Sequence, residues 1–313
     1  MRLGAHIGIT DGFDSAAHTA KKIGCESMQI FSKSPQMWKG AAISDESAAR
    51  FRAAVEEDAV TPIAIHHGYL LNLASPKAFM LKRSRGAFVD ELERAVKLGV
   101  DQLIFHPGAH LGSGPEEGLR TIVESLNWAF SETPDLQVRA LLENCAGQGT
   151  GLCSSFEELQ GILDRLDQPE RAAVVLDTCH LFAAGNDFRT DEQYGEMVDR
   201  IRDSIGAERV QAFHLNDAKA PLGSHLDRHE NIGNGQIGVE GFRHLVNDPT
   251  WRTTPGYLET PIDDEEYTRY IEDLKTLRRL VTSLPKRLDR PTVEHRPPRK
   301  RSPRAGAKGA ADS

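Results

Sequence analysis

The sequence lacks any apolar run near the roughly 20 residues that a membrane-spanning helix requires. Its first ten residues, MRLGAHIGIT, contain one arginine and no long apolar stretch, which argues against a secretory signal peptide. The four cysteines form no C-x-x-C pair and are interpreted as reduced thiols in a reducing compartment. With 39% hydrophobic and 27% charged residues, the chain is expected to be a folded soluble protein with a sizeable core.

Basic residues are scarce in most of the chain and concentrated at its end. Residues 286–313 contain nine Lys/Arg and three Asp/Glu, and the whole chain has a net charge of −8, so residues 1–285 carry −14. Such an acidic body argues against a nucleic-acid partner unless something else supplies positive charge. Residues 285–313 are predicted to form a disordered basic tail. The stretch RPPRKRSPR within it also fits a nuclear import signal, so a cytoplasmic, nucleoid-associated location and a nuclear one both stay open.

Short β-branched or apolar runs alternate with amphipathic stretches eight times. The predicted strands are 3–9, 27–32, 62–67, 102–108, 139–145, 172–180, 210–217 and 257–260. Eight strand–helix units predict an α/β fold with a single (β/α)8 TIM barrel over residues 1–284. An open doubly wound sheet is the alternative, but IGITDGF after the first strand is not the Gly-rich phosphate turn that usually accompanies it.

Two predicted helices carry recognisable start and stop signals. Ser44 is expected to cap a helix over residues 45–59, and Gly99 is expected to end a helix over residues 78–99. In the second helix, five apolar residues fall near helical spacing and predict one buried face: Phe79, Leu81, Phe88, Leu92 and Val96.

Residues of metal-ligand type gather at the predicted carboxyl ends of the strands, where TIM-barrel enzymes carry their active sites. Nine of them converge from six strands and their loops: His66, His106, Glu143, Asp177, His180, His214, Asp227, His229 and Glu259. Any one alone would be interpreted as a hydrogen-bonded core histidine or a helix cap. Nine at one end of a barrel predict a metal site instead.

The size of this set predicts more than one metal ion. Five histidines and four carboxylates exceed the roughly four ligands of a single tetrahedral ion, and clusters of two or three ions suit phosphoester displacement. Three divalent ions would bring +6 against the −4 of the four carboxylates and make the barrel mouth attract phosphate. The acidic body is then no obstacle to a nucleic-acid substrate.

Five segments resemble, in order, the signature segments of the endonuclease IV family of apurinic/apyrimidinic endonucleases. They are FHPGAH, ENCAGQG, LDTCHLFAAG, HLNDAKAPLGSHLDRHENIGNGQIG and LETP, and the similarity extends over residues 3–280. The resemblance implies a TIM barrel that holds three zinc ions and acts as a monomer. It also implies a double-stranded DNA partner that contains abasic sites or blocked 3′ ends, with no membrane partner.

The resemblance also implies a role for each ligand residue. His66, His106 and Glu143 would hold the first zinc; Glu143 would bridge to the second, which is completed by Asp177, His214 and Glu259; the third would be held by His180, Asp227 and His229. The implied reaction is hydrolysis of the phosphodiester on the 5′ side of the abasic sugar, leaving a 3′-hydroxyl and a 5′-deoxyribose phosphate. Glu143 and Glu259 would be catalytic, with Glu259 orienting or deprotonating the attacking water.

Three residues are candidate DNA contacts. Tyr69 and Leu70 match the family's wedge residues, whereas their position alone indicates ordinary core at the start of a helix. Gln36 stands where the family usually has an arginine. Because glutamine can insert into the base stack but carries no charge, weaker and more salt-tolerant binding is predicted at this loop, with unchanged chemistry.

Two other functions remain alternatives. A TIM-barrel sugar isomerase or epimerase would use one or two metals and would not need the Asp227–His229 pair or the loops containing Gln36 and Tyr69. A non-cleaving protein that binds abasic DNA would keep the ligands and leave the duplex intact. Metal content and a nicking assay distinguish the three functions.

Overall fold

A computed structural model describes residues 1–282, which form one unit. Within it, eight parallel strands close into a barrel in the order β1-β2-β3-β4-β5-β6-β7-β10. The strands are β1 Arg2–Ile7, β2 Ser27–Phe31, β3 Ile63–His66, β4 Gln102–Phe105, β5 Arg139–Glu143, β6 Ala172–Asp177, β7 Val210–His214 and β10 Pro255–Leu258. The predicted TIM barrel is therefore confirmed. The predicted tail, residues 285–313, lies outside the described residues.

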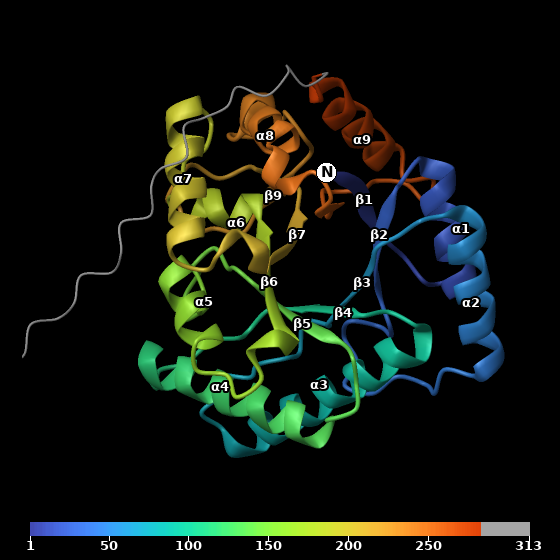
Figure 1. Cartoon of the computed structure of the whole chain (residues 1–313), viewed down its shortest axis with the longest axis vertical. Helices are drawn as coiled ribbons and strands as arrows, with labels where there is room; N and C mark the ends of the chain where they lie inside the picture. The colour runs from blue at the N-terminus through green and yellow to red at the C-terminus, as the bar shows by residue number, and fades with distance from the viewer. Residues whose placement is uncertain (283–313) are drawn as a thin grey trace, which may run out of the picture. The chain divides into compact units, whose positions relative to one another are not determined.

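Helices surround the strands (Figure 1). They are α1 Phe13–Ile23, α2 Asp45–Asp58, α3 Ala78–Leu98, α4 Pro115–Glu132, α5 Phe156–Leu163, α6 Thr178–Ala183, α7 Asp191–Asp203, α8 Gly238–Asn247 and α9 Thr268–Leu280. Between β7 and α8, the short strands β8 (Asp217–Ala218) and β9 (His229–Glu230) pair antiparallel. None of the helices in residues 1–282 combines the length and the apolar character that crossing a bilayer requires.

The predicted strand over residues 172–180 is too long. β6 ends at Asp177, and α6 begins at the next residue. The Asp177 side chain ends the strand because it caps α6, accepting a hydrogen bond from the His180 amide at 2.8 Å. His180 therefore lies on a helix rather than on a turn beyond the strand.

Two layers of apolar side chains fix the barrel. Inside it, small and branched residues fill the interior: Ala64, Ile104, Leu141, Ala173, Val175, Ala212 and Tyr257. A larger core lies between the strands and the helices and includes Phe88 and Leu92 of α3. Because the interior is packed rather than hollow, polar side chains at the strand ends rest on a rigid floor.

The predicted ends of two helices are confirmed, whereas the buried face of α3 is only partly so. Ser44 caps α2 by accepting from the Ser47 amide at 3.1 Å, and Gly99 ends α3 with φ 76°. Phe88 is fully buried, but Phe79 is 72% exposed and Val96 is 45% exposed. Phe79 precedes Phe88 by nine residues, or two and a half helical turns, so the two side chains leave the helix on opposite sides.

This difference along α3 predicts unequal effects of truncation. Phe88→Ala is expected to lower the free energy of unfolding by about 3–5 kcal/mol, because it leaves a cavity beside Phe105, whose ring centroid lies 4.9 Å away. Phe79→Ala on the same helix is the matched control and is expected to change it by less than about 0.5 kcal/mol. Urea denaturation of both variants measures the two values, and equal effects would contradict the packing described here.

Candidate metal centre

All nine predicted ligand residues lie at the mouth formed by the carboxyl ends of the strands. Six of them end a strand or follow it by one residue: His66, His106, Glu143, Asp177, His214 and Glu259. The other three follow β6 or β7, with His180 on α6, His229 in β9, and Asp227 two residues before it. Residues that are as far apart in sequence as His66 and Glu259 thus share one site.

The ligand-type atoms form five overlapping groups, and within each group one atom per residue lies within 4.8 Å of the others. Three of the groups are His66, His106 and Glu143; Glu143, Asp177, His214 and Glu259; and His180, Asp227 and His229; the other two are His66, His214 and Glu259, and Asp177, Cys179 and His229. Glu143 belongs to the first two groups. Three of the five groups have the same members as the ligand sets that the family resemblance implies, and the assignment of ions to them stays a prediction.

Outer hydrogen bonds orient the imidazoles of the third group. His180 Nδ1 donates to the Asn144 carbonyl at 2.8 Å, and His229 Nδ1 donates to the Glu259 carbonyl at 3.1 Å. The opposite nitrogen of each ring faces Asp227, with Nε2–Oδ distances of 3.2 Å for His180 and 3.1 Å for His229. With one proton on Nδ1, each Nε2 is directed at a carboxylate and can take either a second proton or a metal cation between the two groups.

Gln29, which was not predicted, has the same orienting role in the second group. Its buried amide nitrogen donates to Glu259 Oε1 at 2.6 Å, and its oxygen accepts from His214 Nε2 at 2.8 Å. His214 Nδ1 is then left to face Glu143 Oε1 at 3.0 Å. The amide also contacts His6 Nδ1 at 2.8 Å, and His6 Nε2 is buried with no hydrogen-bond partner among the described residues. The only sequence signal for Gln29 is a lone polar residue in the apolar strand SMQIF.

Two asparagines that follow ligand residues were also missed. Asn144 Oδ1 accepts from the Asp177 amide at 2.6 Å, and Asn216 Nδ2 donates to Asp177 Oδ2 at 2.6 Å. Asn216 Oδ1 also accepts from the Glu259 amide at 2.9 Å. Both asparagines are buried, so they fix the backbones of Asp177 and Glu259, and Asn216 also orients the Asp177 carboxylate.

The electrostatics of the centre show that its negative charge must be neutralised. Burial opposes ionisation of Glu143, yet the surrounding histidines hold its pKa well below the usual value. Burial would lower the pKa of His214, but Glu259 and Glu143 raise it to about 9. Burial likewise opposes protonation of His229, while Asp177 and Asp227 raise its pKa to about 9. In the metal-free protein, protons are therefore held between the histidines and the carboxylates. Divalent cations bind in the same positions in metal centres, so these nitrogen and oxygen ligands fit metal ions.

A cavity of about 460 Å³ opens above this centre. His66, His106 and Glu259 lie on its floor, and Tyr69 and Tyr267 contribute to its walls. The interpretation of Tyr69 as ordinary core is wrong, because its side chain is 69% exposed at the rim. Its neighbour Leu70 is half-buried, and Gln36 is exposed in the loop after β2.

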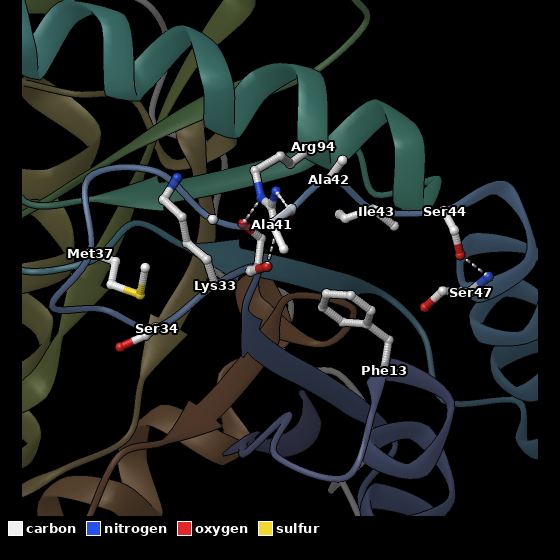
Figure 2. Close-up of a pocket in the computed structure, with 12 residues that line it drawn as sticks. Phe13, Lys33, Ser34, Met37, Ala41, Ala42, Ile43, Ser44, Ser47 and Arg94 are labelled. Carbon is white, nitrogen blue, oxygen red and sulfur yellow. Dashed lines mark hydrogen bonds between the residues drawn. The ribbon is translucent and has the colours of Figure 1, made fainter.

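The loop after β2, residues 32–44, is held by buried charges of α3 (Figure 2). Arg94 donates to Ser32 Oγ at 2.7 Å and to the Ala41 carbonyl at 2.8 Å, so it ties both ends of the loop to the helix. Lys33 Nζ lies 2.6 Å from Glu91 and 2.8 Å from Asp90. A second cavity of about 440 Å³ lies between this loop, Arg94 and α1. The exposed tip that contains Gln36 is therefore presented from a fixed base.

The cysteines near the centre remain protonated in this environment. Burial raises the pKa of Cys145 to about 12, and its Sγ lies 3.7 Å from His106 Nδ1. Burial also raises the pKa of Cys179 to about 12, and its thiol donates to the Arg228 carbonyl at 3.6 Å. The Cys145 thiol therefore lies beside a ligand-type histidine, whereas the Cys179 thiol bonds to a backbone carbonyl and its Sγ also lies within 4.8 Å of ligand-type atoms of Asp177 and His229.

Comparison with known proteins places the chain in a class and then in a family. Residues 17–280 match the family described as xylose isomerase-like TIM barrel, so this is an enzyme of the TIM-barrel class with a histidine–carboxylate centre at the barrel mouth. The chain is 43% identical over 280 residues to the probable endonuclease 4 of Geobacter sulfurreducens, covering 89% of this chain and 94% of that protein. It belongs to the endonuclease IV family of apurinic/apyrimidinic endonucleases.

One solved structure agrees with this family assignment, and a second shares the fold. The crystal structure of endonuclease IV from Thermus thermophilus superposes with a TM-score of 0.79 at 33% identity, covering 90% of this chain and 98% of that one. D-psicose 3-epimerase from Clostridium cellulolyticum superposes with a TM-score of 0.68 at 16% identity, covering 90% and 99%. The second likeness shows the fold alone.

The position of Gln29 predicts a role in metal retention. Gln29→Leu removes the partner of both His214 and Glu259, and a 10- to 100-fold loss of metal affinity is expected, as is usual for residues that orient ligands. Competition with a chromophoric chelator measures this affinity. Gln211→Leu is the matched control, because Gln211 lies near the start of β7, at the other end of the strand from His214. Unchanged affinity in Gln29→Leu would show that the amide does not orient the ligands.

The raised pKa values of His214 and His229 predict how the metal-free protein responds to pH. A group whose pKa rises from 6.5 to about 9 on folding stabilises the protein fully below pH 6.5 and loses this effect as the pH rises through 9. The chelator-treated protein should therefore lose stability between pH 6.5 and 9, by up to ~3 kcal/mol for each group. Metal-loaded protein should lose much less, because cations replace the protons. Urea midpoints across this range measure both, and a metal-free protein that gains stability would contradict the prediction.

Proposed function

We propose that the three groups are three zinc sites and that the protein hydrolyses the phosphodiester on the 5′ side of abasic sites in DNA. The observation that carries the proposal is the clustering of nine ligand-type residues at the barrel mouth, six of which line one cavity. His66, His106 and Glu143 serve the first ion, Glu143 with Asp177, His214 and Glu259 the second, and His180, Asp227 and His229 the third. The products are a 3′-hydroxyl and a 5′-deoxyribose phosphate.

Zinc ions bound there supply Lewis acidity, which polarises the phosphate and makes water acidic near neutral pH. The protein's own groups arrange the reactants. Gln29 fixes one oxygen of Glu259, and the other lies 3.3 Å from His214 Nδ1. Neighbouring histidines hold the pKa of Glu259 below its usual value despite burial, so its carboxylate is ionised and is placed to orient or deprotonate the attacking water. Glu143 joins the first two groups and keeps their spacing fixed.

The cavity and its rim suit a nucleotide without a base. Turning a sugar out of the duplex costs least where no base pair is broken, and a cavity of about 460 Å³ leaves room for the sugar with its phosphate. Tyr69 and Leu70 fill the gap left in the stack from one loop, and Gln36 approaches it from the other. The same site also removes blocked 3′ ends. In both substrates the bond that is hydrolysed joins phosphorus to the oxygen on the 3′ carbon of a deoxyribose.

The proposed assembly is a monomer, since the nine ligand residues all come from one chain. An enzyme that acts on chromosomal DNA works where that DNA is, so we propose a cytoplasmic, nucleoid-associated location.

The third group provides the sharpest test of this function. His229→Ala is expected to lower the rate of nicking by at least about 100-fold, because it removes one side of the Asp227 pair. Mapping the cut on an end-labelled duplex with one tetrahydrofuran site should give a 5′-side nick with a 3′-hydroxyl for the wild type. His18→Ala, a histidine exposed on α1, is the matched control and should cut normally.

Metal analysis separates the alternatives. About three zinc ions per chain are expected, whereas one or two would indicate sugar isomerase chemistry. Tight binding of the abasic duplex without a nick, in protein with a full zinc complement, would indicate a damage-binding protein and reject the proposed hydrolysis.

A further inference from the structure

Two segments at the barrel mouth contain no acidic residue. Residues 27–44 have two Lys/Arg and residues 59–89 have four, with no Asp or Glu in either, although residues 1–285 carry a net charge of −14. The first segment includes the loop after β2; the second includes the loop after β3 and the first half of α3. Because both loops follow the carboxyl ends of neighbouring strands, they lie on the same side of the barrel as the metal centre.

Within residues 1–282, two of these six cations hydrogen-bond or form ion pairs with other side chains. Lys33 pairs with Asp90 and Glu91, and Arg85 donates to Ser125 Oγ at 2.9 Å. The other four are exposed, and within residues 1–282 none of them forms an ion pair with a carboxylate: Lys39, Lys77, Lys82 and Arg83. The positive charge of this part of the mouth is therefore available to a negatively charged partner.

Arg83 joins the two segments. Its guanidinium carbon lies 4.6 Å from the ring centroid of Trp38 in the loop after β2 and 6.0 Å from that of Phe79. Phe79 is 72% exposed, and with Lys82 and Arg83 it follows the i, i+3, i+4 spacing of one helix face. A guanidinium that stacks through its face keeps the N–H donors of its edge free for the oxygens of a phosphate.

We propose that Trp38, Phe79, Lys82 and Arg83, the α3 patch, bind the sugar–phosphate backbone of the duplex beside the abasic nucleotide. This inference rests on the proposed function, since it assigns a second DNA contact outside the cavity. The partner is chosen by charge, because duplex DNA carries one negative charge per ~1.7 Å and the patch lies in the part of the mouth that lacks acidic residues. The patch supplies the positive charge that Gln36 does not supply in the neighbouring loop.

The dimensions of the site support a contact of this kind. The cavity of about 460 Å³ accommodates one sugar with its phosphate, so the remaining duplex must extend over the surrounding loops. The rim of the cavity is joined to the loop that carries Trp38, because the Tyr69 amide donates to the Pro35 carbonyl at 3.2 Å. A duplex centred on the cavity and extending over this loop is thereby directed towards Trp38 and Arg83, which stacks on it.

The test compares two double variants of the full, zinc-loaded chain. Lys82→Ala with Arg83→Ala should raise KM for nicking a tetrahydrofuran-containing duplex about five- to tenfold, because two phosphate contacts are lost. The slope of log KM against log salt concentration should fall by about 1.8, at ~0.9 per phosphate. The change is expected in KM rather than kcat, since the patch is remote from the reacting phosphate.

The matched control removes the same charge from the opposite side of the barrel. Lys22→Ala with Arg279→Ala alters exposed residues at the carboxyl ends of α1 and α9, and it should keep the wild-type KM and salt slope. Arg83→Lys keeps the charge but loses the planar stack on Trp38, so it should keep the salt slope. Thermal melting checks that each variant is folded.

A second readout maps the contact and separates the two proposals. Replacing single flanking phosphates by neutral methylphosphonates should weaken wild-type binding at one or two positions, and the Lys82/Arg83 double variant should be insensitive there. If this variant matches the control variant in KM and salt slope, the α3 patch does not bind DNA and the inference is overturned. If the wild type leaves the duplex uncut, the proposed hydrolysis fails, and anisotropy titrations of an undamaged duplex with the same variants still decide the patch.

Discussion

The mutual repulsion of four carboxylates at the barrel mouth is the constraint on which the structure depends. Glu143 and Asp177 have no exposed surface, and burying such charges costs several kcal/mol each unless opposite charge and hydrogen bonds surround them. Five imidazoles face these carboxylates. Either a proton or a metal ion can lie between an imidazole nitrogen and a carboxylate oxygen and neutralise the negative charge. Gln29 and Asn216 are buried beside these groups, because they hydrogen-bond to the side chains of Glu259, His214 and Asp177, and Asn144 fixes the Asp177 backbone amide.

The barrel provides the rigidity that this arrangement needs. Asp177 and His214 are register partners on adjacent strands, so their backbones are separated only by the width of one strand pair. The packed interior beneath them prevents the strand ends from moving inwards. The loop after β2 is less regular, yet Arg94 and Lys33 tie it to α3 through buried hydrogen bonds and ion pairs. The residues of the metal centre are thus held by the strands of the barrel, whereas the loop after β2 is held by α3.

Charge is distributed along the chain in a way that suits a negatively charged substrate. The acidic residues of the body are absent from residues 59–89, which include the loop after β3 and the first half of α3. Arg83 stacks on Trp38 from the neighbouring loop and so places a cation close to the tip that contains the uncharged Gln36. Substrate affinity can therefore be tuned at the rim without any change to the buried centre.

The sequence by itself determined the barrel, because alternating strand and helix patterns are local, and it indicated the ligand residues, because they end those strands. It did not determine that α6 starts at Thr178, since the capping of that helix by Asp177 interrupts a continuous apolar run. Only the tertiary structure brought Gln29 to Glu259, 230 residues away, because no local pattern distinguishes an orienting amide from a tolerated polar residue. Likewise, Phe79 fitted the apolar spacing of α3 but is exposed, because the side of a helix that is buried depends on what packs against it.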